Sequence, residues 1–315
     1  MGEFEIIASI RSLLGDPPGD VVIGPGDDCA VVRCGSSLLL LTDDAMVEDV
    51  HFTRALLDPR ALGRRAASVA VSDIAAMGGT PRWLLASVGA PPGAGDALVE
   101  LAAGLAERCA ELGATLVGGN LTRSEALMIS LSAAGTVDGE PLLRSTARPG
   151  DLVALTGPVG GAALGLELLM AGGGRDGAAA SLARMWRDPP ARVEAGQALL
   201  GIARAAIDVS DGLLQDLGHV MQASDVGARI ELGNLPLPSG YDDLAPADEP
   251  LAPALAGGED YELLVAIPRD RVENASCDLT VCGAFTEPDA GLVLVHEDGT
   301  EEKADPRGWD HFGGS

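Results

Sequence analysis

The sequence predicts an α/β protein of two domains, and three observations support this. The chain has 315 residues, 47% of them hydrophobic, which allows a large core and favours two domains over one. Short apolar runs typical of strands occur between longer amphipathic stretches typical of helices. The composition changes at residues 137–150, where VDGEPLLRSTARPG is rich in residues that form turns. We therefore place the domains at residues 1–148 and 149–315.

The charge and cysteine content narrow the class of protein. Asp and Glu number 47 against 21 Lys and Arg, the formal net charge is -26, and Lys303 is the only lysine. Such a surface repels nucleic acid and anionic membranes, so we expect neither as a partner. The five cysteines lack the spacing of a zinc knuckle, and neither a signal peptide nor a membrane-length apolar run is present. These features predict a cytoplasmic protein with reduced thiols.

The elements of the first domain follow from local periodicity. Apolar residues at helical spacing predict a helix near residues 4–14, and a turn at Gly24-Pro25-Gly26 separates two short strands. Further helices are predicted from Pro59 to Met77 and from Gly95 to Leu112. Strands are predicted at residues 114–117, ending at Gly118, and at residues 127–134.

The second domain shows the same alternation. Strands are predicted at residues 151–155, 205–207, 279–281 and 292–295, and a further strand containing Tyr261. Helices are predicted at residues 191–204 and 213–223, and after the glycine-rich turn that begins at Gly157. That turn resembles a phosphate cradle but lacks the Gly-Lys-Ser/Thr ending of a Walker loop, so we interpret its glycines as close-packing residues.

The segment from Leu38 to Phe52 carries the first chemical signal. The run Leu38–Leu41 predicts the end of a strand buried on both faces, and Thr42-Asp43-Asp44 follow it directly. Two adjacent carboxylates there need solvent, a cation or several hydrogen bonds. Alternation places Thr42 and Asp44 on one side and Asp43 on the other, so Thr42 and Asp44 can share a divalent cation. The alternative is an acidic turn that only caps a core strand.

Similar acids recur elsewhere in the chain. Asp28 follows the Gly-Pro-Gly turn, and Asp73 lies near the end of a helix, where a carboxylate opposes the helix dipole unless it is simply exposed. Asp208 ends a strand, and Ser210 or Asp211 is expected to be the N-cap of the next helix. A single N-cap does not explain why a further acid, Asp208, lies just before it. Asp28, Asp73, Asp208 and Asp211 are therefore candidates for a shared metal site.

These residues lie within motifs that resemble the thiamine-monophosphate kinase family. The motifs occur in the family's order over nearly the whole chain: GPGDDCAVV (24–32), TDDAMVEDVHF (42–52), VSDIAAMGG (71–79), LVGGN (116–120), LLRSTARPGD (142–151), IDVSDGLLQDLGH (207–219), GGEDYELL (257–264) and GWDHF (308–312). The resemblance implies a two-domain PurM-like fold, related to aminoimidazole ribonucleotide synthase. It also implies a homodimer formed through the mixed N-terminal sheets, and phosphorylation of thiamine monophosphate by ATP with several Mg²⁺ ions.

The resemblance also implies the roles of individual residues. The Mg²⁺ ligands fall on Asp28, Thr42, Asp43, Asp44, Asp73, Asp208 and Asp211. The ATP contacts fall on Gly119, Asn120, Arg144 and Ser210, and the thiamine-monophosphate contacts on His51, Glu259 and Trp309. Asn120 stands where the family usually has Asp, and an amide offers one carbonyl oxygen but no negative charge.

The chemistry of the implied reaction agrees with this set of residues. A phosphate monoester has a second pKa of about 6, so the attacking oxygen is already an anion and needs no general base. The remaining problem is repulsion between two phosphates, which scattered acids binding several Mg²⁺ ions would relieve. Arg144 would be a fixed donor to the nucleotide, His51 a hydrogen-bond partner of the substrate, and Glu259 and Trp309 would hold the cationic thiamine. The alternatives are another ATP-dependent synthetase of the superfamily and a non-catalytic nucleotide- or thiamine-binding relative.

Overall fold

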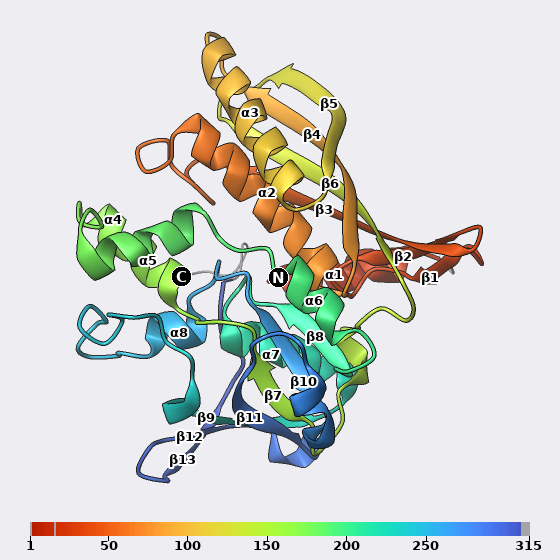
Figure 1. Cartoon of the computed structure of the whole chain (residues 1–315), viewed down its shortest axis with the longest axis vertical. Helices are drawn as coiled ribbons and strands as arrows, with labels where there is room; N and C mark the ends of the chain where they lie inside the picture. Colours follow the sequence, from red (N-terminus) through yellow and green to blue (C-terminus); the bar gives the residue numbers. More distant parts are fainter. Residues whose placement is uncertain (1, 16, 310–315) are drawn as a thin grey trace.

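The N-terminal half is one mixed sheet with two helices on one face. The computed structural model describes residues 2–15 and 17–309. The six-stranded sheet has the order β1-β2-β3-β6-β4-β5, in which only the β4–β5 pair is parallel. Its strands are β1 (Val21–Ile23), β2 (Ala30–Cys34), β3 (Ser37–Val47), β4 (Thr80–Ala90), β5 (Thr115–Arg123) and β6 (Met128–Val137). The first helix, α1 (Glu3–Leu13), stands to the side with β1 and β2 (Figure 1).

Two helices pack closely on this sheet. The helix α2 (Pro59–Ala76) begins at a proline, and the Asp58 side chain accepts a hydrogen bond from the Ala61 N–H. It is buried along most of its length between the sheet and α3 (Gly95–Glu111). Side chains at Gly63 and Gly104 would collide with the backbone of the facing helix, so these glycines permit the close contact.

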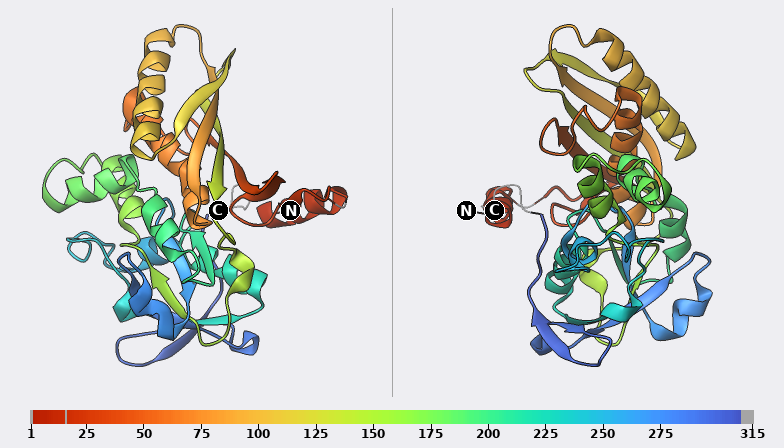
Figure 2. Two further views of the ribbon diagram at one scale, coloured as in Figure 1. Left: turned by 45° about the vertical axis from the view of Figure 1, so that its right-hand side comes forward. Right: turned by 90° about the vertical axis from the view of Figure 1, so that its left-hand side faces the viewer.

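The other face of this sheet is open. Leu41, Trp83 and Leu85 are 39%, 47% and 49% exposed, and the strand register places them on the same face. In both views of Figure 2, the described helices leave the upper part of this face uncovered. A contiguous exposed apolar surface of this kind is typical of a protein interface.

The C-terminal half contains the second sheet. Its seven strands have the order β13-β12-β9-β11-β7-β10-β8, in which only the β12–β9 pair is parallel. The strands are β7 (Leu152–Leu155), β8 (Ala205–Asp208), β9 (Gly227–Glu231), β10 (Leu263–Ile267), β11 (Thr280–Thr286), β12 (Leu292–Val295) and β13 (Glu301–Ala304). The helices are α4 (Gly161–Met170), α5 (Gly177–Arg187), α6 (Val193–Leu199), α7 (Leu213–Ser224) and α8 (Ala252–Ala256). Short 3₁₀ turns cover Arg144–Thr146, Leu232–Asn234, Arg269–Asn274 and Pro288–Ala290.

The two halves share one apolar core at their junction. Trp186 of α5, Val193 of α6 and Tyr261 belong to the same buried cluster as the α2 side chains. A side chain at Gly196 of α6 would collide with the Ala75 carbonyl of α2, so these two helices are in direct contact. The arrangement agrees with the predicted two-domain α/β fold, and the boundary at residue 148 stays a prediction. Of the helices described, not one combines the length and hydrophobicity that a membrane crossing requires.

Several predicted boundaries are wrong, and tertiary pairing explains each one. The strand at Leu38–Leu41 does not end at Thr42 and is not buried on both faces, because β3 continues to Val47 in register with β6 and Leu41 is exposed. Likewise β5 continues through Gly118 to Arg123 along β4. The helix predicted at residues 191–204 is only α6, and β10 begins after Tyr261. The strands β4, β9 and β13 and the helices α5 and α8 are not predicted from the sequence.

Candidate active site

Three of the predicted metal ligands meet at the junction of the two halves. Asp28 precedes β2, Asp73 lies on α2 and Asp208 ends β8, and one carboxylate oxygen from each lies within 4.8 Å of the other two. Asp28 and Asp208 are buried and Asp73 is partly buried. Residues up to 180 positions apart in the chain therefore form one acidic cluster, which we call the aspartate cluster.

Neighbouring side chains orient the aspartate cluster. Ser72 Oγ donates a hydrogen bond to Asp208 Oδ2 at 2.6 Å, and Thr42 Oγ1 donates to Asp73 Oδ2. Arg144 Nη2 donates to Asp28 Oδ1 at 2.5 Å. Asp28 Oδ2 and Arg144 Nε are buried and have no hydrogen-bond partner among the described residues. A buried carboxylate oxygen without a donor is unfavourable unless something else contacts it, and a cation would satisfy it.

The electrostatics of the cluster also favour a bound cation. Burial raises the pKa of Asp73 well above its usual range, and the charges of Asp44, Asp208 and Asp28 raise it further. Burial and the neighbouring Asp28 raise the pKa of Asp208 to about 7. In the protein itself, Arg144 is the counter-charge of Asp28. The carboxylates of Asp44 and Asp208 repel that of Asp73. Divalent cations would relieve that repulsion.

The strand β3 separates Asp43 from Asp44, as its alternation predicts. Asp44 lines the cavity beside the aspartate cluster, and burial raises its pKa to about 6, with smaller contributions from the charges of Asp43 and Asp211. The Asp43 carboxylate points to the open face of the sheet, where it accepts hydrogen bonds from Ser130 at 3.0 Å and Ser132 at 2.5 Å. In one chain, the Asp43 side chain therefore lies on the opposite side of the sheet from the cluster.

The turn before α7 is held by a residue that sequence reasoning missed. The predicted N-cap role of Ser210 or Asp211 is wrong, because Gly212 is the N-cap residue and makes no side-chain cap. The buried Asp216 carboxylate instead accepts the backbone N–H groups of Ser210, Asp211 and Gly212 at 3.0–3.1 Å. Ser210 and Asp211 both line the cavity. A carboxylate in the first helical turn was the available signal.

A cavity of about 560 Å³ brings most of the predicted site residues together. Its lining includes Asp44, Asp73, Asp208, Ser210, Asp211, His51, Glu259 and Trp309. A second cavity of about 760 Å³ shares Ser210 and Asp211 with the first and is also lined by Arg11 and Arg144. Asp211 thus lies where the two cavities meet, and Asp44, Asp73 and Asp208 line the first of them, which suits a reaction between two bound molecules.

The predicted substrate contacts lie on the wall of the first cavity. His51 Nδ1 accepts the Val47 backbone N–H at 3.0 Å, which selects the neutral tautomer with a hydrogen on Nε2. Trp309 is 53% exposed, and its backbone N–H donates to the Asp211 carbonyl at 3.1 Å. Glu259 accepts from Arg65 and Trp186, two residues that sequence reasoning did not select. The rest of the GWDHF motif, residues 310–312, lies outside the described residues.

Gly119 and Asn120 do not join the other candidates within one chain. Both are exposed on the edge strand β5, and Gly119 is in register with Ala86 of β4, Leu131 of β6 and Asp44 of β3. Three strand spacings of about 4.8 Å separate β5 from β3, or about 14 Å in all. The register also places Asn120 on the open face, in line with Ser87 and Ser130.

The glycine-rich turn before α4 is a packing element, as the sequence predicts. The buried Asp260 carboxylate accepts the backbone N–H groups of Gly160 at 2.5 Å and Ala162 at 3.0 Å. It therefore already occupies the anion-binding end of the helix. A side chain at Gly165 would collide with the backbone of α5 at Leu182.

Comparison with known proteins places the chain among enzymes. The models of AIR synthase related protein, N-terminal domain and C-terminal domain, match residues 26–137 and 148–288. The thiamine-monophosphate kinase of Escherichia coli (strain K12) is 36% identical over 324 residues, which span 99% of this chain and 98% of the relative. That of Aquifex aeolicus (strain VF5) is 36% identical over 316 residues, with the same coverage of 99% and 98%.

Solved structures of thiamine-monophosphate kinases are also similar to this chain. AaThiL complexed with AMPPCP and TMP has a TM-score of 0.88 at 34% identity, covering 99% of this chain and 97% of that chain. The thiamine monophosphate kinase from Aquifex aeolicus has a TM-score of 0.82 at 31% identity, covering 96% of this chain and all of that chain (100%). The hydrogenase maturation protein HypE of E. coli shares the fold, with a TM-score of 0.69 at 18% identity.

Proposed function

Since the chain belongs to the thiamine-monophosphate kinases of the AIR synthase related family, we propose that it phosphorylates thiamine monophosphate to thiamine diphosphate with ATP. The observation that carries the proposal is the convergence of Asp28, Asp73 and Asp208 beside a cavity lined by Asp44 and Asp211. Such a density of carboxylates is unfavourable in the protein alone and is expected where cations join two phosphates.

The residues present fit Mg²⁺. The orphaned oxygen of Asp28 and the mutual repulsion of Asp73 and Asp208 identify a place where hard cations are favourable. We propose that Asp28, Asp44, Asp73, Asp208 and Asp211 hold the ions, with Thr42 beside Asp73. Bound Mg²⁺ would supply the positive charge that lets two phosphate groups approach.

The side chains themselves bind and orient the two substrates. Arg144 lines the second cavity with an unpaired Nε–H, so it is a donor to the nucleotide phosphates, and Ser210 stands where the two cavities meet. His51 and Trp309 both line the first cavity, where we propose that His51 hydrogen-bonds the acceptor molecule and that the Trp309 indole stacks on its cationic heterocycle. Because the acceptor phosphate is already an anion, none of these residues has to remove a proton.

The remaining candidates favour a homodimer. Asp43, Asn120 and the exposed Leu41, Trp83 and Leu85 all lie on the open face of the N-terminal sheet. We propose that a second copy of the chain covers this face. Gly119 and Asn120 would then act in ATP binding across the interface, since they lie too far from Asp44 within one chain.

The direct test is to incubate the purified protein with ATP, Mg²⁺ and thiamine monophosphate and to measure thiamine diphosphate by chromatography. We expect product to form in proportion to ATP consumed and to disappear when EDTA removes the metal. Binding of ATP without any product would favour the non-catalytic relative. ATP consumption with another acceptor, and none with thiamine monophosphate, would favour a different synthetase of the superfamily.

A further inference from the structure

The charge of Glu259 is paired from inside the protein. Arg65 Nη2 donates to Glu259 Oε1, and Trp186 Nε1 donates to Glu259 Oε2 at 2.7 Å. Arg65 is completely buried, lies 4.9 Å from the centre of the Trp186 ring and also donates Nη1 to the Trp186 carbonyl. Both carboxylate oxygens therefore already accept a hydrogen bond on the protein side, while Glu259 still lines the cavity.

The backbone around Glu259 is held in an unfavourable conformation. Glu259 and Tyr261 have φ values of 70° and 51°, in the left-handed region that non-glycine residues rarely adopt. Their N–H groups donate to the Ser210 and Val209 carbonyls, both at 2.8 Å. Such strain persists only where surrounding contacts compensate for it, and the Arg65–Glu259 pair supplies one of those contacts.

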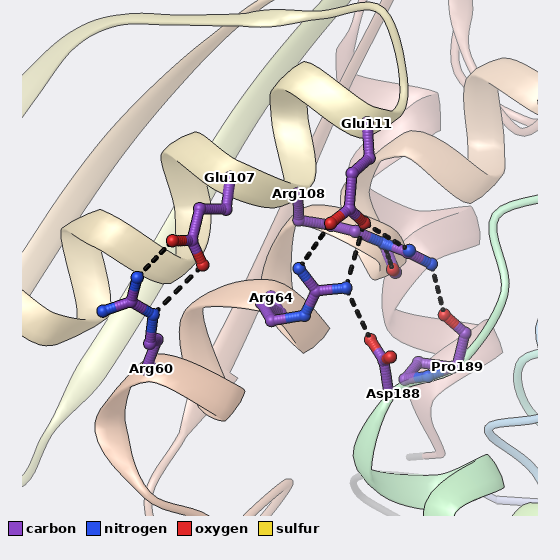
Figure 3. Close-up of polar contacts among 8 residues, drawn as sticks. Arg60, Arg64, Glu107, Arg108, Glu111, Asp188 and Pro189 are labelled. Atoms are coloured by element: carbon purple, nitrogen blue, oxygen red, sulfur yellow. Dashed lines mark hydrogen bonds and ion pairs between the residues drawn. The ribbon is translucent and has the colours of Figure 1, made fainter.

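The N-terminal half also fixes the position of Trp186. Arg64 of α2 contacts the Asp188 carboxylate at 3.6 Å, and Arg108 of α3 donates to the Pro189 carbonyl at 3.1 Å (Figure 3). Arg187 donates in return to the Leu56 carbonyl at 3.0 Å. The segment after Trp186 is thus tied to α2 and α3, and Arg65 and Trp186 form one rigid support for Glu259.

We propose that Arg65 and Trp186 are positioning residues, which hold Glu259 at the cavity wall as a hydrogen-bond acceptor for the organic part of the phosphate acceptor. The inference rests on the proposed function and specifies how that substrate is recognised. Because Arg65 already balances the charge of Glu259, the carboxylate selects an N–H donor by its remaining lone pairs rather than a cation by its charge. In thiamine monophosphate the exocyclic amine of the pyrimidine is such a donor, whereas the thiazolium ring carries the charge. The proposed role differs from the expectation drawn from the sequence, in which Glu259 binds thiamine by its charge.

Steady-state kinetics of matched variants test the positioning role. In Trp186→Phe and Arg65→Lys we expect the KM for thiamine monophosphate to rise about tenfold, as for the loss of one charge-assisted hydrogen bond. The KM for ATP and kcat should stay within about twofold, because the aspartate cluster is untouched. The KM for thiamine monophosphate should rise further in Arg65→Met than in Arg65→Lys, because lysine keeps the positive charge. The control is Arg60→Met, which removes the exposed ion pairs of Arg60 with Glu100 and Glu107 and contacts neither Glu259 nor the segment after Trp186, so both KM values should stay unchanged.

The substrate arm uses oxythiamine monophosphate, which keeps the thiazolium charge but has a carbonyl in place of the amine. We expect the wild-type KM for this compound to be at least about tenfold higher than for thiamine monophosphate, and the preference to shrink in Trp186→Phe. Equal use of the two compounds by the wild-type protein would overturn the inference. So would an unchanged KM for thiamine monophosphate in folded Trp186→Phe and Arg65→Lys.

A binding measurement separates this inference from the proposed function. The indole N–H resonance of Trp186, assigned by its loss in Trp186→Phe, should shift when thiamine monophosphate is added to the wild-type protein. The shift should be absent in Glu259→Gln. An inactive wild-type protein that shows this shift would contradict the proposed kinase and still support the positioning of Glu259, whereas absence of the shift would refute the positioning itself.

Discussion

At the scale of single residues, the decisive feature is the direction in which each acid points. Asp43 and Asp44 are neighbours on β3, yet Asp44 lines the cavity and Asp43 accepts hydrogen bonds from Ser130 and Ser132 on the opposite face. The strand period of two imposes this difference, and no feature of the two residues taken separately contains it.

The first prediction compares these two neighbours. Asp44→Asn should lower kcat at least about a hundredfold, because a carboxylate ligand beside the reacting phosphates becomes a neutral amide. Asp43→Asn should lower kcat less than about tenfold, since its side chain lies outside the aspartate cluster in the chain. Rates measured over a Mg²⁺ titration, with circular dichroism as a check of folding, decide between them. Equal losses in the two variants would show that Asp43 acts at the site as directly as Asp44.

The second prediction is that removing one carboxylate of the aspartate cluster lowers activity and raises thermal stability. Asp208→Asn removes one of three repelling carboxylates and keeps an oxygen that accepts from Ser72. We expect this variant to lose turnover and yet to unfold at a higher temperature than the wild type when EDTA is present at neutral pH. Differential scanning calorimetry measures the midpoint, and a lower midpoint in the variant would show that the ionised cluster is not unfavourable.

At the scale of elements, α7 depends on an acid from inside its own first turn. Asp216 accepts three backbone N–H groups of the turn that carries Ser210 and Asp211. Asp216→Ala should therefore lower the free energy of unfolding by about 2–3 kcal/mol, the range for a lost cap and buried unsatisfied donors. Urea denaturation measures this value. A Mg²⁺ titration of activity should also require more metal, because Asp211 is no longer held, and an unchanged titration would limit Asp216 to stability.

At the scale of the whole molecule, the raised pKa values set the pH dependence of stability. The pKa of Asp208 is about 7 in the folded protein, against an ordinary value of 3.8 for an aspartate side chain. Between these values the folded state keeps a proton that the unfolded state releases, so stability falls as pH rises from about 4 to 7. We expect the midpoint temperature of thermal unfolding of the metal-free protein to fall by roughly 5 °C or more between pH 5 and 8. A change of 1 kcal/mol in the free energy of unfolding moves this temperature by roughly 2 °C in a chain of this size.

Two controls accompany this measurement. Saturating Mg²⁺ should flatten the profile, because metal bound to the ionised carboxylates stabilises the folded state at the higher pH. Asp208→Asn should also flatten it in part. A metal-free midpoint that rises with pH would mean that the buried acids are ionised at no cost, contrary to the geometry of the aspartate cluster.

The open sheet face leads to a prediction about assembly. Trp83→Glu should convert the proposed homodimer to monomer, because a charge replaces a half-exposed indole in the middle of an apolar surface. Analytical ultracentrifugation measures the mass, and folding is checked by circular dichroism. If Asn120 acts across that interface, Trp83→Glu should also raise the KM for ATP. A dimer that persists in Trp83→Glu would place the interface elsewhere.

The sequence by itself determined the family, the two-domain α/β class and most of the acids that converge. It could do so because strand and helix periods, glycine turns and the motifs around Asp28, Asp44, Asp73 and Asp208 are local features of the chain. It also predicted the opposite directions of Asp43 and Asp44, since alternation along a strand is local too.

Only the tertiary structure decided which residues support the site from a distance. The length of β3, the cap made by Asp216, the separation of Asn120 from Asp44, and the contacts of Arg65 and Trp186 with Glu259 all depend on pairing and packing between remote segments. Arg65 and Glu259 are 194 positions apart, and no local pattern marks either as the partner of the other. The physical reason is that a buried charge needs a partner of opposite charge, and only folding brings such a partner from a remote part of the chain into contact with it.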